Sequence, residues 1–202
     1  ENNEEAGEHW TPRDVVELMA DLIFCPIAER IKDATYSCYD GACGTGGMLT
    51  VAQDRLLALA AEHGRKVSIH LFGQEVNPET YAIAKADMLL KGDGAQAEHI
   101  AFGSTLSADR HPARQFDFML SNPPYGKSWV TDASHMGGKK EILDTRFHAH
   151  LASGENLAML PRTSDGQLLF LLNNVAKMKK KTPLGSRIAE VHNGSSIFTG
   201  DA

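Results

Sequence analysis

A strand followed by a glycine-rich turn and a helix constrains the fold of this chain most. Residues 34–39 have the composition of a short strand, and they lead into Asp-Gly-Ala-Cys-Gly-Thr-Gly-Gly-Met at 40–48. Apolar residues at helical spacing follow from Leu49 onward. The glycines allow a ligand to approach the backbone closely, and the helix N-terminus favours an anionic group such as a carboxylate. Asp40, at the strand end, suits an ammonium group. The glycine spacing does not fit the G-x-G-x-x-G pattern of dinucleotide sites.

The same strand and helix alternation continues along the chain. Further strands are predicted at 67–72, 99–102, 116–120 and 187–191, with helices or long connections between them. This order predicts an α/β fold, a doubly wound parallel sheet flanked by helices, with strand order 3-2-1-4-5. The fifth strand is then an edge of the sheet. Glu75, at the tip of the second strand, is placed to bind two ribose hydroxyls.

Capping residues and apolar spacing predict three of the helices and their buried faces. Thr11 is expected as an N-cap before Pro12, and Asn77 as the N-cap of a second helix. Residues 165–167 are expected to open a third. The connection 127–164 is weakly periodic and is predicted to be a long, partly ordered loop over the site. The residues expected to be buried are Val15, Leu18, Met19 and Leu22, then Ala82, Ile83, Ala86, Leu89 and Leu90, and finally Leu168, Leu169, Leu172, Val175 and Ala176.

The sequence Ser-Asn-Pro-Pro-Tyr-Gly at 121–126 follows the predicted fourth strand directly. Two consecutive prolines end a strand and restrict the residues before them, so Asn122 and Pro123 are expected to be extended and rigid. An amide, two carbonyls and the exposed ring of Tyr125 then lie where open α/β sheets bind ligands. An ordinary strand-ending turn is the alternative interpretation.

Composition limits the partners of the chain. It has 202 residues, of which 42% are hydrophobic and 23% charged, and its net charge is −6. No apolar run approaches the roughly 20 residues of a membrane span, and the acidic start resembles no signal peptide. Three cysteines without C-x-x-C spacing argue against a metal or disulfide framework and favour a reducing cytoplasm. A protein that grips DNA alone is usually basic, so a nucleic-acid substrate would require help from another subunit.

Six motifs in a fixed order resemble a known family. They are Glu-His-Trp-Thr-Pro-Arg at 8–13, the glycine loop at 40–47, Gly-Gln-Glu at 73–75, the sequence at 121–126, and Asp-Gly-Gln at 165–167 followed by Asn-Gly-Ser at 193–195. Together they look like an S-adenosylmethionine-dependent amino-methyltransferase of Rossmann-like fold. The closer resemblance is to the modification subunit of a type I restriction-modification system, over nearly the whole chain.

The resemblance implies a role for each matching residue. The stretch of Glu8, His9, Trp10, Thr11, Pro12 and Arg13 would contact the methionine end of S-adenosylmethionine. The amino and carboxylate groups would bind Asp40 and the loop containing Gly44, Thr45, Gly46 and Gly47, and the ribose would bind Glu75. Ser104 stands where the family more often has an acidic residue for the adenine amino group. Catalysis would belong to Asn122, Pro123, Pro124 and Tyr125, and no metal is implied.

By the same resemblance, the chain would methylate adenine N6 in DNA after the base is flipped out of the duplex. Its partners would be DNA, a specificity subunit and a restriction subunit, with no membrane. Residues 1–202 would be one incomplete methyltransferase domain, truncated after the fifth strand and without the family's N-terminal helical part. Three alternatives remain: methylation of a protein glutamine or an RNA base, a cofactor-binding scaffold, and, more distantly, a nicotinamide-dependent oxidoreductase.

Overall fold

The alternation of strands and helices is realised as a five-stranded sheet in the computed structural model, which describes residues 11–91 and 94–194. The sheet strands are β1 Ala34–Asp40, β2 Val67–Glu75, β3 Ile100–Phe102, β4 Phe118–Ser121 and β7 Arg187–Glu190. The main helices are α1 Arg13–Phe24, α2 Gly47–Glu62, α3 Pro78–Leu90 and α6 Gln167–Ala176, and the shorter ones are α4 Gly94–Ala97, α5 Val130–His135 and the 3-10 turns η1 Cys25–Arg30 and η2 Thr145–Phe147. Two small strands, β5 His148–His150 and β6 Asn156–Ala158, form a separate hairpin.

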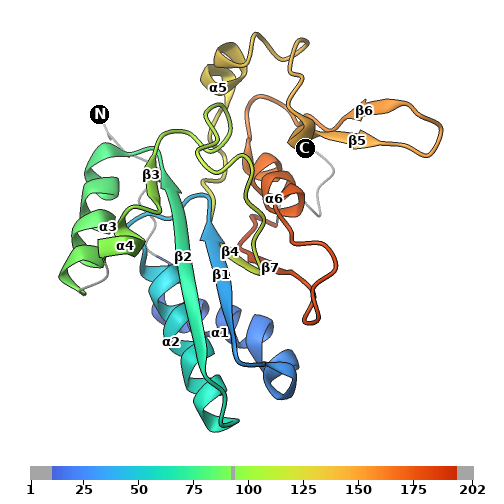
Figure 1. The fold of residues 1–202 in the computed structure, drawn as a ribbon. Helices are drawn as coiled ribbons and strands as arrows, with labels where there is room; N and C mark the ends of the chain where they lie inside the picture. The colour runs from blue at the N-terminus through green and yellow to red at the C-terminus, as the bar shows by residue number, and fades with distance from the viewer. Residues whose placement is uncertain (1–10, 92–93, 195–202) are drawn as a thin grey trace.

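The strand order is β3-β2-β1-β4-β7, and every neighbouring pair in this sheet is parallel. The order predicted from the sequence is therefore confirmed. All carboxyl ends lie at one edge of the sheet, at the top in Figure 1. The strand order reverses between β1 and β4: the chain builds the sheet outward from β1 to β3 and then returns to place β4 on the other side of β1. This is the topological switch point where such sheets bind ligands. Within the described residues β7 pairs only with β4, so it is an edge strand as expected.

Both faces of the sheet are buried because the strand side chains alternate between two apolar clusters. Cys38, Leu71 and Phe118 lie in the larger cluster, together with buried residues of α1 and α2. Tyr39, Phe72 and Met119 point to the opposite face and form a smaller cluster with Phe116. The helix α6 lies on that second face, where Asn173 contacts the Tyr39 hydroxyl.

The predicted helix ends are mostly correct, but the predicted buried faces are correct only in part: of the expected residues, Met19 and Leu169 are buried. In α1 the buried residues are Val16, Met19, Ala20, Ile23 and Phe24, and in α3 they are only Ala84 and Met88. The expected Leu18 and Leu22, and likewise Ile83, Leu89 and Leu90, are exposed. In α6 only Leu169 of the expected set is buried, alongside Gln167, Asn173 and Asn174. This face is polar because buried polar groups of the sheet and its loops lie opposite it.

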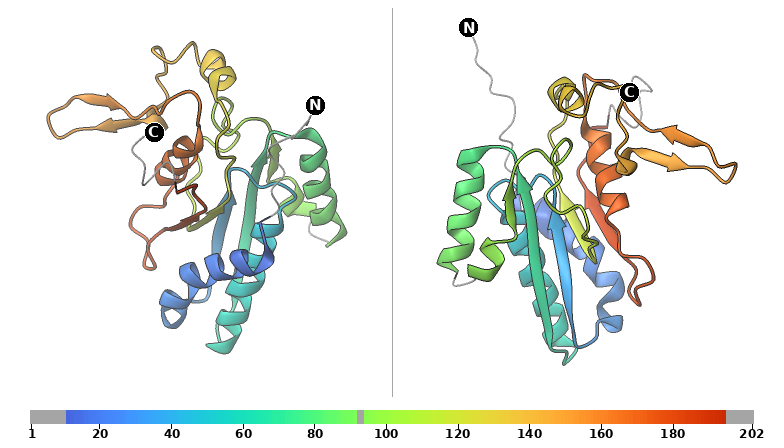
Figure 2. Two further views of the ribbon diagram at one scale, coloured as in Figure 1. Left: turned by 180° about the vertical axis from the view of Figure 1, so that it is seen from behind. Right: turned by 45° about the horizontal axis from the view of Figure 1, so that its top comes forward.

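The connection 127–164 is not the loop that was predicted. It contains α5, η2 and the β5–β6 hairpin, and its own small apolar cluster includes Trp129, Ala133, Ile142 and Phe147. The hairpin projects away from the sheet in all views, whereas α5 lies above the carboxyl ends of the strands (Figures 1 and 2). We call residues 127–164 the excursion. Among the described residues, no helix has the length and apolar content needed to cross a membrane.

Candidate functional site

The strand register brings the predicted ligand-binding groups together at the switch point. Asp40 ends β1, Glu75 ends β2 and Ser121 ends β4, all at the same edge of the sheet. The hydroxyl of Ser121 donates to Asp40 Oδ1 at 2.8 Å, across 81 residues of sequence. The glycine loop and the Asn-Pro-Pro-Tyr sequence are therefore joined by a buried hydrogen bond.

The glycine loop has the backbone geometry that its residues predict. Gly44 and Gly46 have φ of +54° and +84°, a region that L side chains rarely adopt. A Cβ at Gly44 or Gly47 would meet no atom within 4 Å, so the loop borders open space. Gly46 is the N-cap of α2, and no side chain caps this helix within the described residues. The first-turn N–H groups of α2 are consequently suited to an anion.

Glu75 holds the glycine loop in place. Its carboxylate accepts the Gly44 N–H at 2.9 Å through one oxygen and the Asn77 N–H at 2.8 Å through the other. Each carboxylate oxygen has a further lone pair for a hydroxyl. Glu75 can therefore bind a diol while it braces the loop, a structural task that its position in the sequence did not reveal.

Asp40 is a buried carboxyl group, only 1% exposed. Besides Ser121 it accepts the Ala42 N–H at 2.9 Å. Burial raises its pKa to about 7, and the charges of Glu75 and Glu190 act in the same direction, whereas the two hydrogen bonds oppose the rise. An acid with this pKa changes charge near neutrality, and a neighbouring cation would favour its ionised form.

The residues after β4 form a rigid, partly exposed turn. Pro123 is buried, Pro124 is exposed and the Tyr125 side chain is 43% exposed, in agreement with the expected exposed ring. The Asn122 amide donates from Nδ2 to Thr11 Oγ1 at 2.9 Å. Thr11 is therefore not the N-cap that was predicted; Pro12 occupies that position and α1 has no side-chain cap.

Ser104 is accompanied by a carboxylate that the sequence interpretation missed. Its hydroxyl donates to Asp132 Oδ1 at 2.6 Å, and Ser107 donates to the same oxygen at 2.6 Å. Asp132 belongs to α5, inside the excursion. An acidic side chain 28 positions further along the chain therefore lies beside Ser104.

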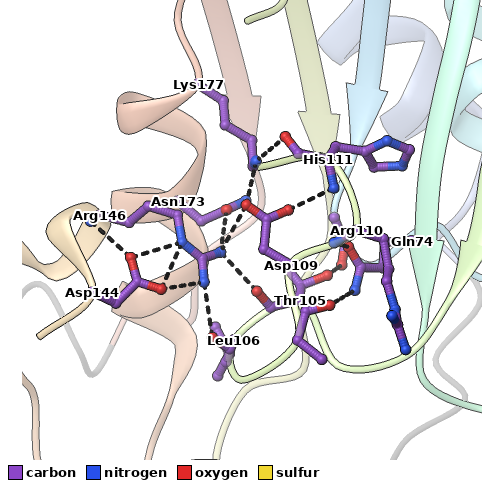
Figure 3. Close-up of polar contacts among 12 residues, drawn as sticks. Gln74, Thr105, Leu106, Asp109, Arg110, His111, Asp144, Arg146, Asn173 and Lys177 are labelled. Atoms are coloured by element: carbon purple, nitrogen blue, oxygen red, sulfur yellow. Dashed lines mark hydrogen bonds and ion pairs between the residues drawn. The ribbon is translucent and has the colours of Figure 1, made fainter. Parts of the chain in front are cut away.

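A buried polar network holds the excursion against the sheet (Figure 3). The Arg146 guanidinium, 10% exposed, donates to the carbonyls of Thr105 and Leu106 at 2.8 and 2.9 Å and to Asn173 Oδ1 at 2.8 Å. It also pairs with Asp144 at 2.7 Å. Thr105 in turn donates to the Gly41 carbonyl of the glycine loop. The loop after β3 is therefore fixed on one side by the excursion and on the other by the glycine loop.

Lys177 is part of the same network. It is 3% exposed and donates to Asp109 Oδ2 at 2.6 Å and to the His111 carbonyl at 2.8 Å. It is the first residue of a basic cluster, residues 177–181, that directly follows α6. Burial instead commits this lysine to the interior, and only the rest of the cluster could meet a partner.

The other predicted residues are distributed unevenly. Gly47 and Thr45 lie in the glycine loop, whereas Arg13 is on the surface of α1, paired with Glu17 at 2.9 Å. Glu8, His9 and Trp10 lie outside the described residues. The described residues contain no group of three or more His, Cys, Asp or Glu side chains that could hold a metal ion.

Gln74, beside Glu75, is fully buried, and its Nε2 donates to the carbonyls of Gly103 and Ala108.

Comparison with known proteins agrees with this geometry. The family model described as N-6 DNA Methylase matches residues 1–202. The type I restriction enzyme MpnII methylase subunit of Mycoplasma pneumoniae is 32% identical over 177 residues, which are 83% of this chain and 28% of that protein. The chain thus spans little more than a quarter of this relative.

Solved structures show the same fold. The type I restriction-modification system methyltransferase subunit from Streptococcus thermophilus is 25% identical with a TM-score of 0.62, over 89% of this chain and 34% of that one. A structure from Listeria monocytogenes, described as a proposed class I S-adenosylmethionine-dependent methyltransferase, is 17% identical with a TM-score of 0.60, over 95% of this chain and 48% of that one. The expected Rossmann-like methyltransferase fold is therefore confirmed.

Proposed function

Because the chain belongs to the N-6 DNA methylase family, we propose that it carries the cofactor-binding and catalytic residues of a site-specific DNA methyltransferase. The reaction is transfer of a methyl group from S-adenosylmethionine to adenine N6. The protein acts as the modification subunit of a type I restriction-modification complex, with DNA, a specificity subunit and a restriction subunit as partners. The observation that carries the proposal is the Ser121–Asp40 bond, which joins the glycine loop to the Asn-Pro-Pro-Tyr turn at the switch point.

The site fits the groups of S-adenosylmethionine. The uncapped N-terminus of α2 suits its carboxylate, and Asp40 suits its ammonium group. Each carboxylate oxygen of Glu75 accepts one backbone N–H group, from Gly44 or Asn77, and its remaining lone pair accepts a ribose hydroxyl. Ser104, together with Asp132, presents oxygen acceptors to the adenine amino group. When bound, the cofactor would supply an electrophilic methyl group attached to a positively charged sulfur. The sulfur would leave as part of a neutral thioether.

The residues after β4 act on the flipped adenine. The N6 lone pair is delocalised into the ring, so the amine is a poor nucleophile. If Asn122 Oδ1 and the Pro123 carbonyl each accept one amino hydrogen, the nitrogen is favoured in a tetrahedral form with its lone pair free. Tyr125 stacks on the base, a contact worth about 1–3 kcal/mol by analogy with single-strand binders. Catalysis is then mainly orientation and electrostatics.

The test is methyl incorporation by the full-length protein with its partner subunits. Tritiated S-adenosylmethionine and duplex DNA containing the complex's recognition sequence should give labelled N6-methyladenine after digestion. An otherwise identical duplex in which the target adenine already carries an N6-methyl group is the matched control and should accept no label. Label in protein or RNA but not in DNA would exclude the proposed substrate, and the absence of S-adenosylmethionine binding would exclude the proposed cofactor.

A further inference from the structure

The hydroxyl of Thr11 holds the side chain of Asn122, although 111 positions separate them in sequence. A threonine before a helix commonly uses its hydroxyl to cap the helix N–H groups. In this chain Pro12 is the N-cap and no side chain caps α1, so that hydroxyl is not used for the helix. Instead it accepts Asn122 Nδ2 at 2.9 Å.

An asparagine amide has two chemically different sides. Its nitrogen can only donate and its oxygen can only accept, so the orientation of the amide decides which group faces a ligand. The terminal torsion of asparagine is broad and does not select one orientation by itself. Among the described residues, Thr11 is the one side chain that hydrogen-bonds the Asn122 amide. While Nδ2 donates to Thr11, Oδ1 is directed elsewhere and remains available as an acceptor.

The backbone around Asn122 is already constrained, so the torsions of the Asn122 side chain are the conformational freedom that remains. Pro123 and Pro124 restrict the chain and bring no N–H groups that could compete for Oδ1. Ser121, on the other side, is committed to Asp40 at 2.8 Å. Thr11 therefore fixes a group that neither the prolines nor the serine can orient.

We propose that Thr11 is a positioning residue for methyl transfer: its hydroxyl holds the Asn122 amide in place through Nδ2, so that Oδ1 is directed away from Thr11 and can face the target amino group. This inference rests on the proposed function, because it assigns the acceptor that the target amine requires. It gives Thr11 a role toward the catalytic amide in addition to any contact with the cofactor. Loss of the hydroxyl removes this contact, so the amide turns more freely and Oδ1 faces the amine in fewer of the molecules.

The experiment compares Thr11→Val, which has nearly the same shape but no hydroxyl, with Thr11→Ser, which keeps the hydroxyl. Both are made in the full-length protein with its partner subunits. Thr35→Val is the matched control, because Thr35 bonds the exposed Ser68 at the amino end of β1, away from the site. The transfer rate is measured at saturating S-adenosylmethionine and saturating duplex, and the cofactor dissociation constant by calorimetry.

We expect Thr11→Val to lower the saturated rate about tenfold or more, as loss of one orienting hydrogen bond at a reacting centre would. The cofactor dissociation constant should change less than the rate, Thr11→Ser should recover most of the rate, and Thr35→Val should match the wild type. An unchanged saturated rate with weaker cofactor binding would overturn the inference, since Thr11 would then serve the cofactor alone. Equal losses in Thr11→Ser and Thr11→Val would overturn it as well. An inactive wild type would instead refute the proposed function on which the inference rests.

Discussion

The buried carboxyl group of Asp40 should make the protein less stable as the pH rises from about 4 to about 7. Burial raises the pKa of Asp40 to about 7, and nearby carboxylates add to this effect. In the unfolded chain the same group has its ordinary pKa of about 3.8. The folded protein therefore disfavours the ionised form, and the cost is absent below about pH 4 and complete above about pH 7.

The size of this effect follows from the pKa change. One pKa unit corresponds to about 1.4 kcal/mol, so a rise from 3.8 to about 7 costs about 4 kcal/mol when the carboxylate is fully ionised. Asp40→Asn removes the charge and keeps an oxygen that can accept from Ala42 N–H and the Ser121 hydroxyl. We expect the variant to match the wild type near pH 4 and to exceed its free energy of unfolding at pH 8, by up to that amount.

Urea unfolding at pH 4 and pH 8, followed by tryptophan fluorescence, measures the difference. Asp54→Asn controls for the loss of one carboxylate, because Asp54 is exposed on α2. If the gap between Asp40→Asn and the wild type were the same at both pH values, the argument from burial would be refuted. A constant gap would mean that Asp40 has the same charge in the folded and unfolded chain.

The same ionisation should control cofactor affinity. Only the ionised carboxylate attracts an ammonium group strongly, and at pH 6 about a tenth of Asp40 is ionised if its pKa is about 7. S-adenosylmethionine should therefore bind about tenfold more weakly at pH 6 than on the plateau above about pH 8, and binding at pH 6 should release a proton. Asp40→Asn should bind weakly at both pH values. A pH-independent affinity in the wild type would remove Asp40 from the ammonium site.

Three further predictions concern the neighbouring residues. Glu75→Ala should weaken S-adenosylmethionine binding by about 1.5–3 kcal/mol, because it removes hydrogen bonds to a charged group; unchanged affinity in calorimetry would exclude Glu75 from the site. Asn122→Ala should abolish transfer while cofactor binding persists, and Tyr125→Phe should retain much of the activity that Tyr125→Ala loses; equal inactivity of Tyr125→Phe and Asn122→Ala would contradict stacking. Arg146→Met should destabilise the protein by about 3–5 kcal/mol, because it breaks the ion pair with Asp144 and leaves the buried carbonyls of Thr105 and Leu106 without their donor. Hydrogen exchange should then rise first in residues 127–164, and uniform exchange across the sheet would argue against a local anchor.

The sheet could be predicted from the sequence because its signals are local. Each strand is a short apolar run that ends at a glycine, an acid or a proline, and the right-handed connections leave few possible orders. Asn77 was identified as a cap for the same reason: its side chain accepts the N–H groups of Glu79 and Thr80, two and three positions away. Short-range signals of this kind do not depend on what packs against the element.

The buried faces of the helices depend on distant partners, and here the predictions failed. Apolar spacing alone placed Ile83 and Leu89 of α3 inside, but the sheet meets Ala84 and Met88. In α6 the inner face is occupied by Asn173 and Asn174 because the Tyr39 hydroxyl and a Glu190 oxygen lie opposite. No pattern within a helix shows that its partner surface is polar. The excursion was interpreted as a loop for a similar reason, since Arg146 bonds carbonyls 40 and 41 positions earlier in the chain.

In the candidate site, too, local sequence identifies the chemical groups, whereas distant contacts orient them. The motifs supplied Asp40, Glu75, Ser121 and Asn122, since each ends a strand or directly follows one. The contacts that orient these groups span 31 residues for Glu75, 81 for Ser121 and 111 for Asn122. The rate of a reaction that depends mainly on orientation is therefore sensitive to residues outside the motifs by which the reaction is recognised in the sequence. It follows that a substitution at Asp132, which lies in none of the motifs, can weaken the site while every motif is kept.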